Sequence, residues 1–136
     1  MKNCEIYEYD GEGYRKLFNH RNWRVAVLNY IDELEPENIQ YVEAHSQTDE
    51  VFVLLDGRCK LLFADANSGK IENMSSVSLE KNKVYKIPAG VFHSHTLSKD
   101  ARLLIIEEEN TNYENSPRIY LDNHGKDMLT KAFSEV

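Results

Sequence analysis

The sequence predicts an all-β fold, a sandwich or barrel of short antiparallel strands. Runs rich in β-branched and aromatic residues recur along the chain, and each is bounded by a polar or glycine-containing turn. After its first residue, the run at 50–55 is apolar on both faces, as expected for a strand in a buried wall. The chain has 136 residues, close to the commonest domain size, so we expect one domain over residues 1–136.

The expected strands lie between about residues 23 and 109, which would form the barrel core. They cover residues 23–31, 39–45, 50–55, 58–64, 71–79, 83–87, 93–97 and 101–108. Asp56-Gly57 between two apolar runs is a hairpin signal, so residues 58–64 are expected to fold back antiparallel on residues 50–55. The strand at 39–45 is expected as a neighbour of 50–55, and the more polar strand at 71–79 is expected at an edge or facing outward.

The sequence after residue 109 no longer has the pattern of short strands. Residues 110–118 have the composition of a polar loop, and Asp122 or Asn123 could cap a helix over about residues 123–134. An apolar stripe at helical spacing runs through this segment: Leu121, Met128, Leu129, Ala132 and Phe133. Because most amphipathic helices pack against their own domain, we expect this helix to cover the outside of the β body.

Charge and composition exclude several classes of partner. The formal net charge is -7 and the pI is near 5.2, so we expect neither nucleic acid nor a membrane surface as a partner. The chain begins without the apolar segment of a signal peptide, and its two cysteines, Cys4 and Cys59, form no CxxC pair. A cytoplasmic protein is the simplest expectation. The acidic run at 107–109 is expected to be a solvated face.

Ionisable residues gather around the apolar run at 50–55. At strand period two, Glu43 and His45 share one face, and Glu50 opens the apolar run. Burying such groups beside an apolar strand is unfavourable unless something pairs with them, and a divalent metal ion is one candidate. Further along, His93 and His95 share a face of another expected strand.

Two segments resemble the two motifs of the cupin superfamily. Residues 43–57 read E-x-H-x4-E-x6-G, which resembles the first motif, and residues 88–93 read P-x-G-x2-H, which resembles the second. The resemblance implies a small single-domain cupin. Its fold would be the cupin-type double-stranded β-helix, a jelly-roll barrel, followed by a C-terminal α-helix. Because similar small cupins commonly dimerise, the resemblance also implies a homodimer.

The resemblance implies which residues of this chain would be metal ligands. His45, Glu50 and His93 stand where cupins have two of their histidines and their glutamate. Glu43 stands where the family has its first histidine, so either Glu43 or His95 would complete the set. The ligands would hold one divalent metal ion, with zinc, iron, manganese and nickel all possible. Without a metal, these groups would only hydrogen-bond one another across the barrel.

The activity stays open at this stage, because cupins include isomerases, lyases, dioxygenases and ligand-binding proteins. We expect a metal-dependent enzyme of the cupin type acting on a small molecule, whose metal polarises a substrate oxygen or activates a water. The alternative is a non-catalytic cupin that binds a sugar or another small metabolite. Arg24 and Arg102 are candidates for holding a single carboxylate of the ligand.

Overall fold

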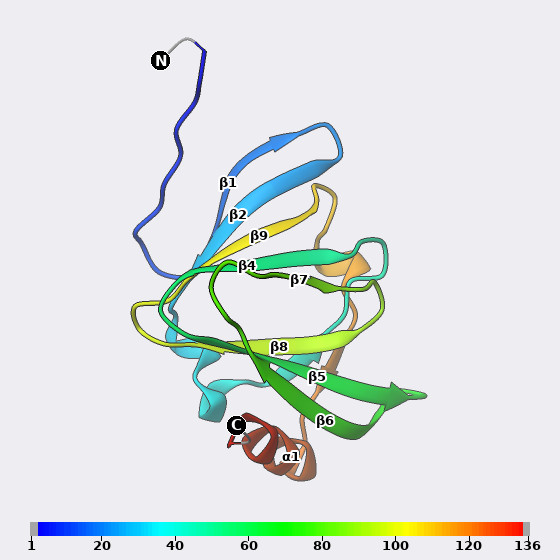
Figure 1. Ribbon diagram of the computed structural model, residues 1–136. Coiled ribbons are helices and arrows are strands. Elements are labelled where there is room, and N and C mark those ends of the chain that lie inside the picture. The colour runs from blue at the N-terminus through cyan, green and yellow to red at the C-terminus, as the bar shows by residue number, and fades with distance from the viewer. Residues whose placement is uncertain (1–2, 135–136) are drawn as a thin grey trace.

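Two five-stranded antiparallel sheets lie face to face in this computed structural model, which describes residues 3–134 (Figure 1). The first sheet contains, in spatial order, β1 (Tyr14–His20), β2 (Trp23–Asn29), β9 (Arg102–Glu108), β4 (Glu50–Asp56) and β7 (Val84–Ile87). The second contains β10 (Arg118–Tyr120), β3 (Tyr41–Glu43), β8 (Phe92–Leu97), β5 (Cys59–Asn67) and β6 (Lys70–Ser78). The predicted all-β fold is confirmed.

Short helical turns and one α-helix complete the structure. The turns are η1 (Asp32–Leu34), η2 (Pro36–Asn38) and η3 (Tyr113–Asn115), and the α-helix is α1 (Asn123–Ser134). The predicted C-terminal helix is confirmed, and its cap is Asp122, whose Oδ1 accepts a hydrogen bond from Gly125 N at 2.7 Å. Leu129 and Phe133 of α1 are buried with Leu62 of the second sheet. None of the helices in residues 3–134 is long and apolar enough to cross a membrane.

Strand alternation places the core between the two sheets. On β4, Phe52 and Leu54 are buried while the intervening Val53 is only partly so. On β9, Leu103 and Ile105 are buried in the same way. These side chains form one apolar cluster with residues of the second sheet, including Leu61. The inner faces of the two sheets therefore share a core, and the polar residues on those faces are carried into the interior.

The predicted hairpin at Asp56-Gly57 is wrong, because this turn carries the chain from one sheet to the other. β4 pairs with β7 and β9, whereas β5 pairs with β6 and β8. Gly57 has a φ of 69°, and a Cβ added there would lie 2.6 Å from the backbone N of Ala101. Only glycine allows this close approach, which sets the two strands in facing layers, where both bury their apolar side chains.

Two other expectations for the strands need correction. The strand at 39–45 is not a neighbour of 50–55, because β3 pairs with β8 and β10 in the second sheet. The edge strands β1 and β10 lie outside the predicted strands, since β1 is rich in polar residues and β10 has only three residues, so both give a weak strand signal. The predicted edge position of the strand at 71–79 is confirmed, because β6 pairs only with β5 in the described residues.

Candidate metal centre

Three buried side chains converge between the two sheets: His45, Glu50 and His93. Glu50 opens β4 and points inward with Phe52, His93 lies on β8, and His45 follows β3. His93 Nε2 lies 3.0 Å from Glu50 Oε1, and His45 Nε2 lies 3.3 Å from the same oxygen. One ligand atom from each residue falls within 4.8 Å of the others, so the three can serve a single ion.

The second nitrogen of each imidazole is held from outside the cluster. His93 Nδ1 lies 3.0 Å from the carbonyl oxygen of Val91, and His45 Nδ1 lies 2.8 Å from Ser116 Oγ. Because a carbonyl oxygen can only accept, His93 Nδ1 must donate, which leaves the lone pair of a neutral His93 on Nε2. Such contacts fix the tautomer and orientation that a metal-ligating histidine needs.

A divalent cation fits this cluster on chemical grounds. The lone pair of a neutral His93 on Nε2 would face the Glu50 carboxylate at 3.0 Å, and two electron-rich atoms at that distance repel each other. The contact becomes favourable when a proton or a metal ion lies between them. Two imidazoles and one carboxylate are also a ligand set that zinc and iron accept, with coordination positions left open.

The pKa values of the cluster show where a proton sits when metal is absent. Burial alone would raise the pKa of Glu50, but hydrogen bonds from His45 and His93 outweigh it and hold that pKa well below its usual range. Burial would lower the pKa of His45, but its hydrogen bond to Glu50 and the negative charges of Glu50, Glu107 and Glu43 together outweigh burial and raise that pKa. In the metal-free protein a proton held between His45 and Glu50 therefore takes the place that a cation would occupy.

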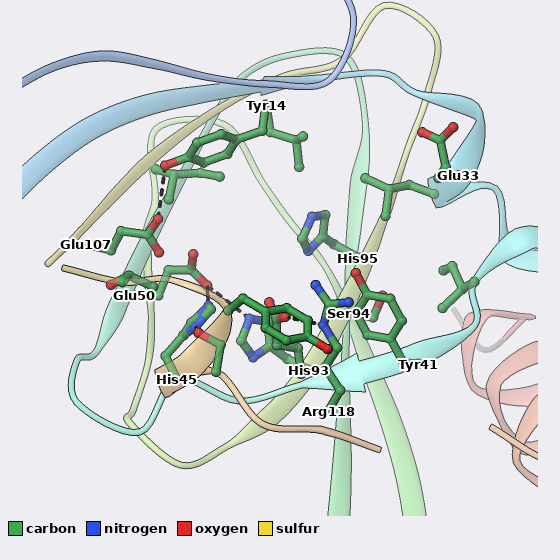
Figure 2. A pocket seen from close by; sticks show the side chains of 18 of the residues that line it. Tyr14, Glu33, Tyr41, His45, Glu50, His93, Ser94, His95, Glu107 and Arg118 are labelled. Atoms are coloured by element: carbon green, nitrogen blue, oxygen red, sulfur yellow. Dashed lines mark hydrogen bonds and ion pairs between the residues drawn. The ribbon is translucent and has the colours of Figure 1, made fainter. Parts of the chain in front are cut away.

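The cluster lines a cavity of about 500 Å³ between the two sheets (Figure 2). Figure 2 shows His95, Tyr41 and Arg118 directed toward the same space. The volume of the cavity is in the range of pockets that hold small molecules, and its lining mixes apolar side chains with a few polar ones. The arrangement can place a small ligand beside the three candidate metal ligands.

The two residues proposed to complete the ligand set both lie outside the group whose ligand atoms fall within 4.8 Å of one another, and they differ in their surroundings. Glu43 lines the cavity, but its Oε2 accepts a hydrogen bond from Arg118 Nε at 2.8 Å. His95 also lines the cavity, and its Nδ1 has no hydrogen-bond partner among residues 3–134. Burial and the nearby His93 lower the pKa of His95 to about 4, so its imidazole is neutral, as a metal ligand must be.

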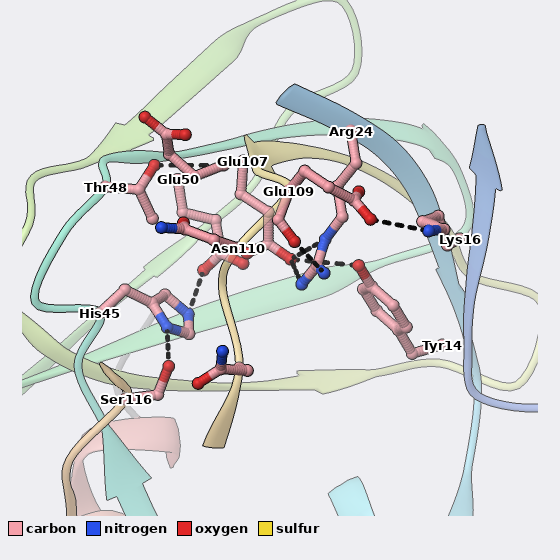
Figure 3. Close-up of polar contacts among 12 residues, drawn as sticks. Tyr14, Lys16, Arg24, His45, Thr48, Glu50, Glu107, Glu109, Asn110 and Ser116 are labelled. Atoms are coloured by element: carbon pink, nitrogen blue, oxygen red, sulfur yellow. Dashed lines mark hydrogen bonds and ion pairs between the residues drawn. The ribbon is translucent and has the colours of Figure 1, made fainter. Parts of the chain in front are cut away.

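Glu107 was not predicted as a site residue, and the expectation that residues 107–109 form a solvated face is wrong for it. Glu107 lines the cavity and is only 5% exposed. Arg24 Nη2 donates to its Oε1 at 2.7 Å and Tyr14 Oη donates at 3.1 Å, as Figure 3 shows. The signal was present in the sequence, because Leu103, Ile105 and Glu107 alternate along one strand face.

Glu107 lies against Glu50 on the neighbouring strand. Val51 of β4 pairs with Ile106 of β9, which sets the two glutamates at the same level of the sheet. Burial, and the hydrogen bond that a protonated Glu107 forms with Glu50, raise the pKa of Glu107 to about 7. The cavity therefore contains a carboxyl group that is near its titration midpoint at neutral pH.

In the metal-free protein, stability is expected to fall as the pH rises from about 4.5 to about 7 because of Glu107. Folded Glu107 keeps its proton across this window, whereas the unfolded chain has released it, so the unfolded state binds fewer protons. The loss is on the order of 1–3 kcal/mol. Urea denaturation across this window should show the decline in the wild type and not in Glu107→Gln. An equal decline in both proteins would contradict the assignment.

Neither arginine proposed to bind a carboxylate is available in the cavity. Arg24 lines the cavity, but it is committed to Glu107 and to the carbonyl oxygen of Glu109. Arg102 lies outside this cavity and pairs with Asp10. Arg118, which was not predicted, lines the cavity instead. The sequence predicts a polar loop up to residue 118, but Arg118 opens strand β10 in the structure, so nothing in the sequence indicated that it would point inward.

Solved structures similar to this chain share its fold. The sequence matches no protein-family model, and no curated protein matches it. A cupin-2 domain protein from Shewanella frigidimarina is 20% identical, with 74% of this chain and 85% of that chain covered and a TM-score of 0.53. The QdtA 3,4-ketoisomerase from Thermoanaerobacterium thermosaccharolyticum, a double mutant in complex with TDP, is 16% identical, with 82% and 72% covered and a TM-score of 0.53.

A third similar structure contains a metal ion. HppE with Co(II), in complex with its substrate, is 18% identical to this chain, with 78% of this chain and 59% of that chain covered and a TM-score of 0.53. Together with the two facing sheets and the motif residues between them, these similarities show that the chain has the cupin fold. The resemblance read from residues 43–57 and 88–93 is confirmed at the level of the fold.

Proposed function

We propose that this chain is a metal-dependent enzyme of the cupin type that acts on a small molecule in the cavity between its sheets. His45, Glu50 and His93 would hold one divalent ion. The observation that carries the proposal is the convergence of these three buried groups on the wall of a cavity of about 500 Å³. Buried ionisable groups beside a pocket of this size are typical of an active site.

The bound ion would supply Lewis acidity at an oxygen of the substrate. The surrounding residues would orient the ligands and exclude water: Ser116 and Val91 fix the two imidazoles, and Phe52 packs at 6.3 Å from the ring of His93. Isomerase, lyase and dioxygenase chemistry all remain compatible with this arrangement. HppE, crystallised with Co(II) and with Fe(II), and the ketoisomerase QdtA support the class of function, because both have this fold.

The identity of the ion stays open among zinc, iron, manganese and nickel. For a fourth protein ligand we propose His95 ahead of Glu43. The free Nδ1 of His95 supports this choice, whereas the Glu43 carboxylate is already paired with Arg118. Moving Glu43 Oε2 onto a metal would break its hydrogen bond with Arg118 Nε.

Elemental analysis of the full chain tests the proposal. The protein is purified without chelator and without a nickel column, and its metal content is measured before and after dialysis against EDTA. We expect near-stoichiometric metal and a lower melting temperature after EDTA, because a ligand of the folded state stabilises it. Absence of metal, together with a melting temperature that EDTA leaves unchanged, would contradict the proposal and favour a non-catalytic cupin that binds a sugar or another small metabolite.

The remaining expectations from the resemblance stay predictions. These are a single domain over residues 1–136, a homodimer and a cytoplasmic location. Light scattering of the purified chain measures its mass directly and tests the dimer.

A further inference from the structure

Arg118 lines the same cavity as the candidate metal centre and lies on the same sheet as His93. It pairs with Glu43 across β10 and β3, and Glu43 pairs with His93 across β3 and β8. Arg118, Glu43 and His93 therefore form one row across three strands of the second sheet. Figure 2 shows the guanidinium end of Arg118 pointing into the cavity beside Tyr41. A ligand held there would lie in the same space as the three metal-ligand candidates.

Four contacts fix the guanidinium of Arg118, one of them a side-chain hydrogen bond with Tyr120. Its Nε donates to Glu43 Oε2 at 2.8 Å. Its Cζ lies 4.1 Å from the centre of the Tyr41 ring and 4.8 Å from the centre of the Tyr113 ring. Guanidinium groups stack on aromatic rings in this way, and the contacts limit rotation of the long side chain. The end that bears Nη1 and Nη2 is thus oriented before any ligand binds.

A carboxylate is the group that this end of an arginine matches. The two terminal nitrogens donate parallel hydrogen bonds to two oxygens, and a fixed guanidinium loses little conformational entropy when it binds them. The charge of the cavity limits the choice further. Four carboxyl groups line it against two arginines: Glu33, Glu43, Glu50, Glu107, Arg24 and Arg118. A phosphate dianion would be repelled more strongly than a singly charged carboxylate.

We propose that Arg118 anchors a single carboxylate group of the small molecule that occupies the cavity. The inference rests on the proposed function only in calling that molecule a substrate, since the guanidinium contacts involve no metal. It assigns the substrate to the small monocarboxylic acids rather than to phosphorylated compounds. It also gives Glu43 the role of holding Arg118 in place.

Binding of benzoate to metal-depleted protein tests this proposal. Removing the metal ensures that the carboxylate cannot bind to the ion instead. By calorimetry, we expect benzoate to bind at least about tenfold more tightly than its neutral analogue benzamide, and phenyl phosphate to bind no better than benzoate. Cyclohexanecarboxylate and hexanoate extend the panel to other shapes. Failure of all three carboxylates to bind, or equal binding of benzoate and benzamide, would overturn the proposal.

Variants locate the binding at Arg118. Arg118→Gln is expected to weaken benzoate binding at least about tenfold, and Arg118→Lys to fall between this variant and the wild type. Arg15→Gln is the matched control, because Arg15 also stacks on a tyrosine, Tyr9 at 5.2 Å, but does not line the cavity. Glu43→Gln should weaken benzoate binding, but less than Arg118→Gln does, because it removes the carboxylate that holds Arg118 and leaves the guanidinium in the cavity. Unchanged binding in both Arg118 variants would overturn the proposal.

The same proteins separate this inference from the proposed function. Metal content measured before depletion should be equal in the wild type and in Arg118→Gln, whose substitution leaves the three candidate ligands intact. If the wild type contains no metal but binds benzoate through Arg118, the proposed enzyme fails and the carboxylate site stands. If the protein holds metal but no carboxylate binds, the proposed metal site stands and the carboxylate site at Arg118 fails.

Discussion

His93→Ala is expected to abolish metal retention. His93 is 5% exposed, its Nδ1 is held by the carbonyl oxygen of Val91, and its Nε2 is directed at the Glu50 oxygen that His45 shares. We therefore expect no other side chain to supply a nitrogen at the position of His93 Nε2. Loss of residues that only support a ligand weakens metal binding about 10- to 100-fold, and loss of a ligand itself should exceed about 100-fold. Metal content after gel filtration, with a zinc or iron titration of the depleted protein, measures the effect. His45→Ala should behave in the same way.

Three further variants test whether Glu43 or His95 is the fourth ligand. Glu43→Gln is expected to retain the ion, because its carboxylate is paired with Arg118. His95→Ala should weaken retention less than His93→Ala does, because Nε2 of His45 and of His93 and the Glu50 carboxylate remain. His124→Ala is the control, since His124 is exposed on α1. If Glu43→Gln loses the ion while His95→Ala keeps it, then Glu43 is the fourth ligand and our preference is wrong.

Gly57→Ala is expected to cost about 3 kcal/mol of unfolding free energy. A residue with a side chain is strained at a φ of 69°, which accounts for about 1–3 kcal/mol. The new Cβ would also lie 2.6 Å from the Ala101 backbone, so the corner between β4 and β5 would have to move away from the start of β9. Overpacking of this kind typically adds about 1–3 kcal/mol. Urea denaturation of the metal-free protein measures the loss.

Gly69→Ala separates these two causes. Gly69 has a φ of 78°, but a Cβ added there meets nothing within 4 Å. Only the backbone strain should remain, so the loss is expected to be about 1 kcal/mol. Equal losses in the two variants would mean that the approach of Gly57 to Ala101 is not what makes the corner sensitive.

Local sequence patterns predicted the strands and the motif residues, because both depend on short-range spacing. Phe52 and Leu54 alternate with partly buried neighbours as the strand period requires, and the helical stripe with Leu129 and Phe133 packs as expected. His45, Glu50 and His93 were singled out through the resemblance of residues 43–57 and 88–93 to the two cupin motifs, and the structure brings these three side chains together. Strand periodicity alone placed only neighbouring residues, such as Glu43 and His45, on a shared face.

The pairing of strands could not be predicted in the same way. A glycine with positive φ is suitable for a hairpin and equally for a corner between two sheets, and only the approach of Gly57 to Ala101 distinguishes them. The positions of Glu107 and Arg118 depend on that pairing. Strand alternation with Leu103 and Ile105 places Glu107 on the inner face, but its contact with Arg24 and its position beside Glu50 follow only from β9 lying between β2 and β4. Arg118 enters the cavity only because β10 pairs with β3.

Ser116 and Arg118 belong to one short stretch of chain that runs beside the end of β3. Its backbone is tied to that strand by hydrogen bonds from Ala44 N to Pro117 O and from Ser46 N to Asn115 O. Ser116 supports the imidazole of His45, and Arg118 reaches the ligand space two residues later. Engineering this stretch to accept a different ligand would therefore disturb the candidate metal site as well. Selectivity should instead be altered at Tyr41, whose side chain reaches the cavity from another strand.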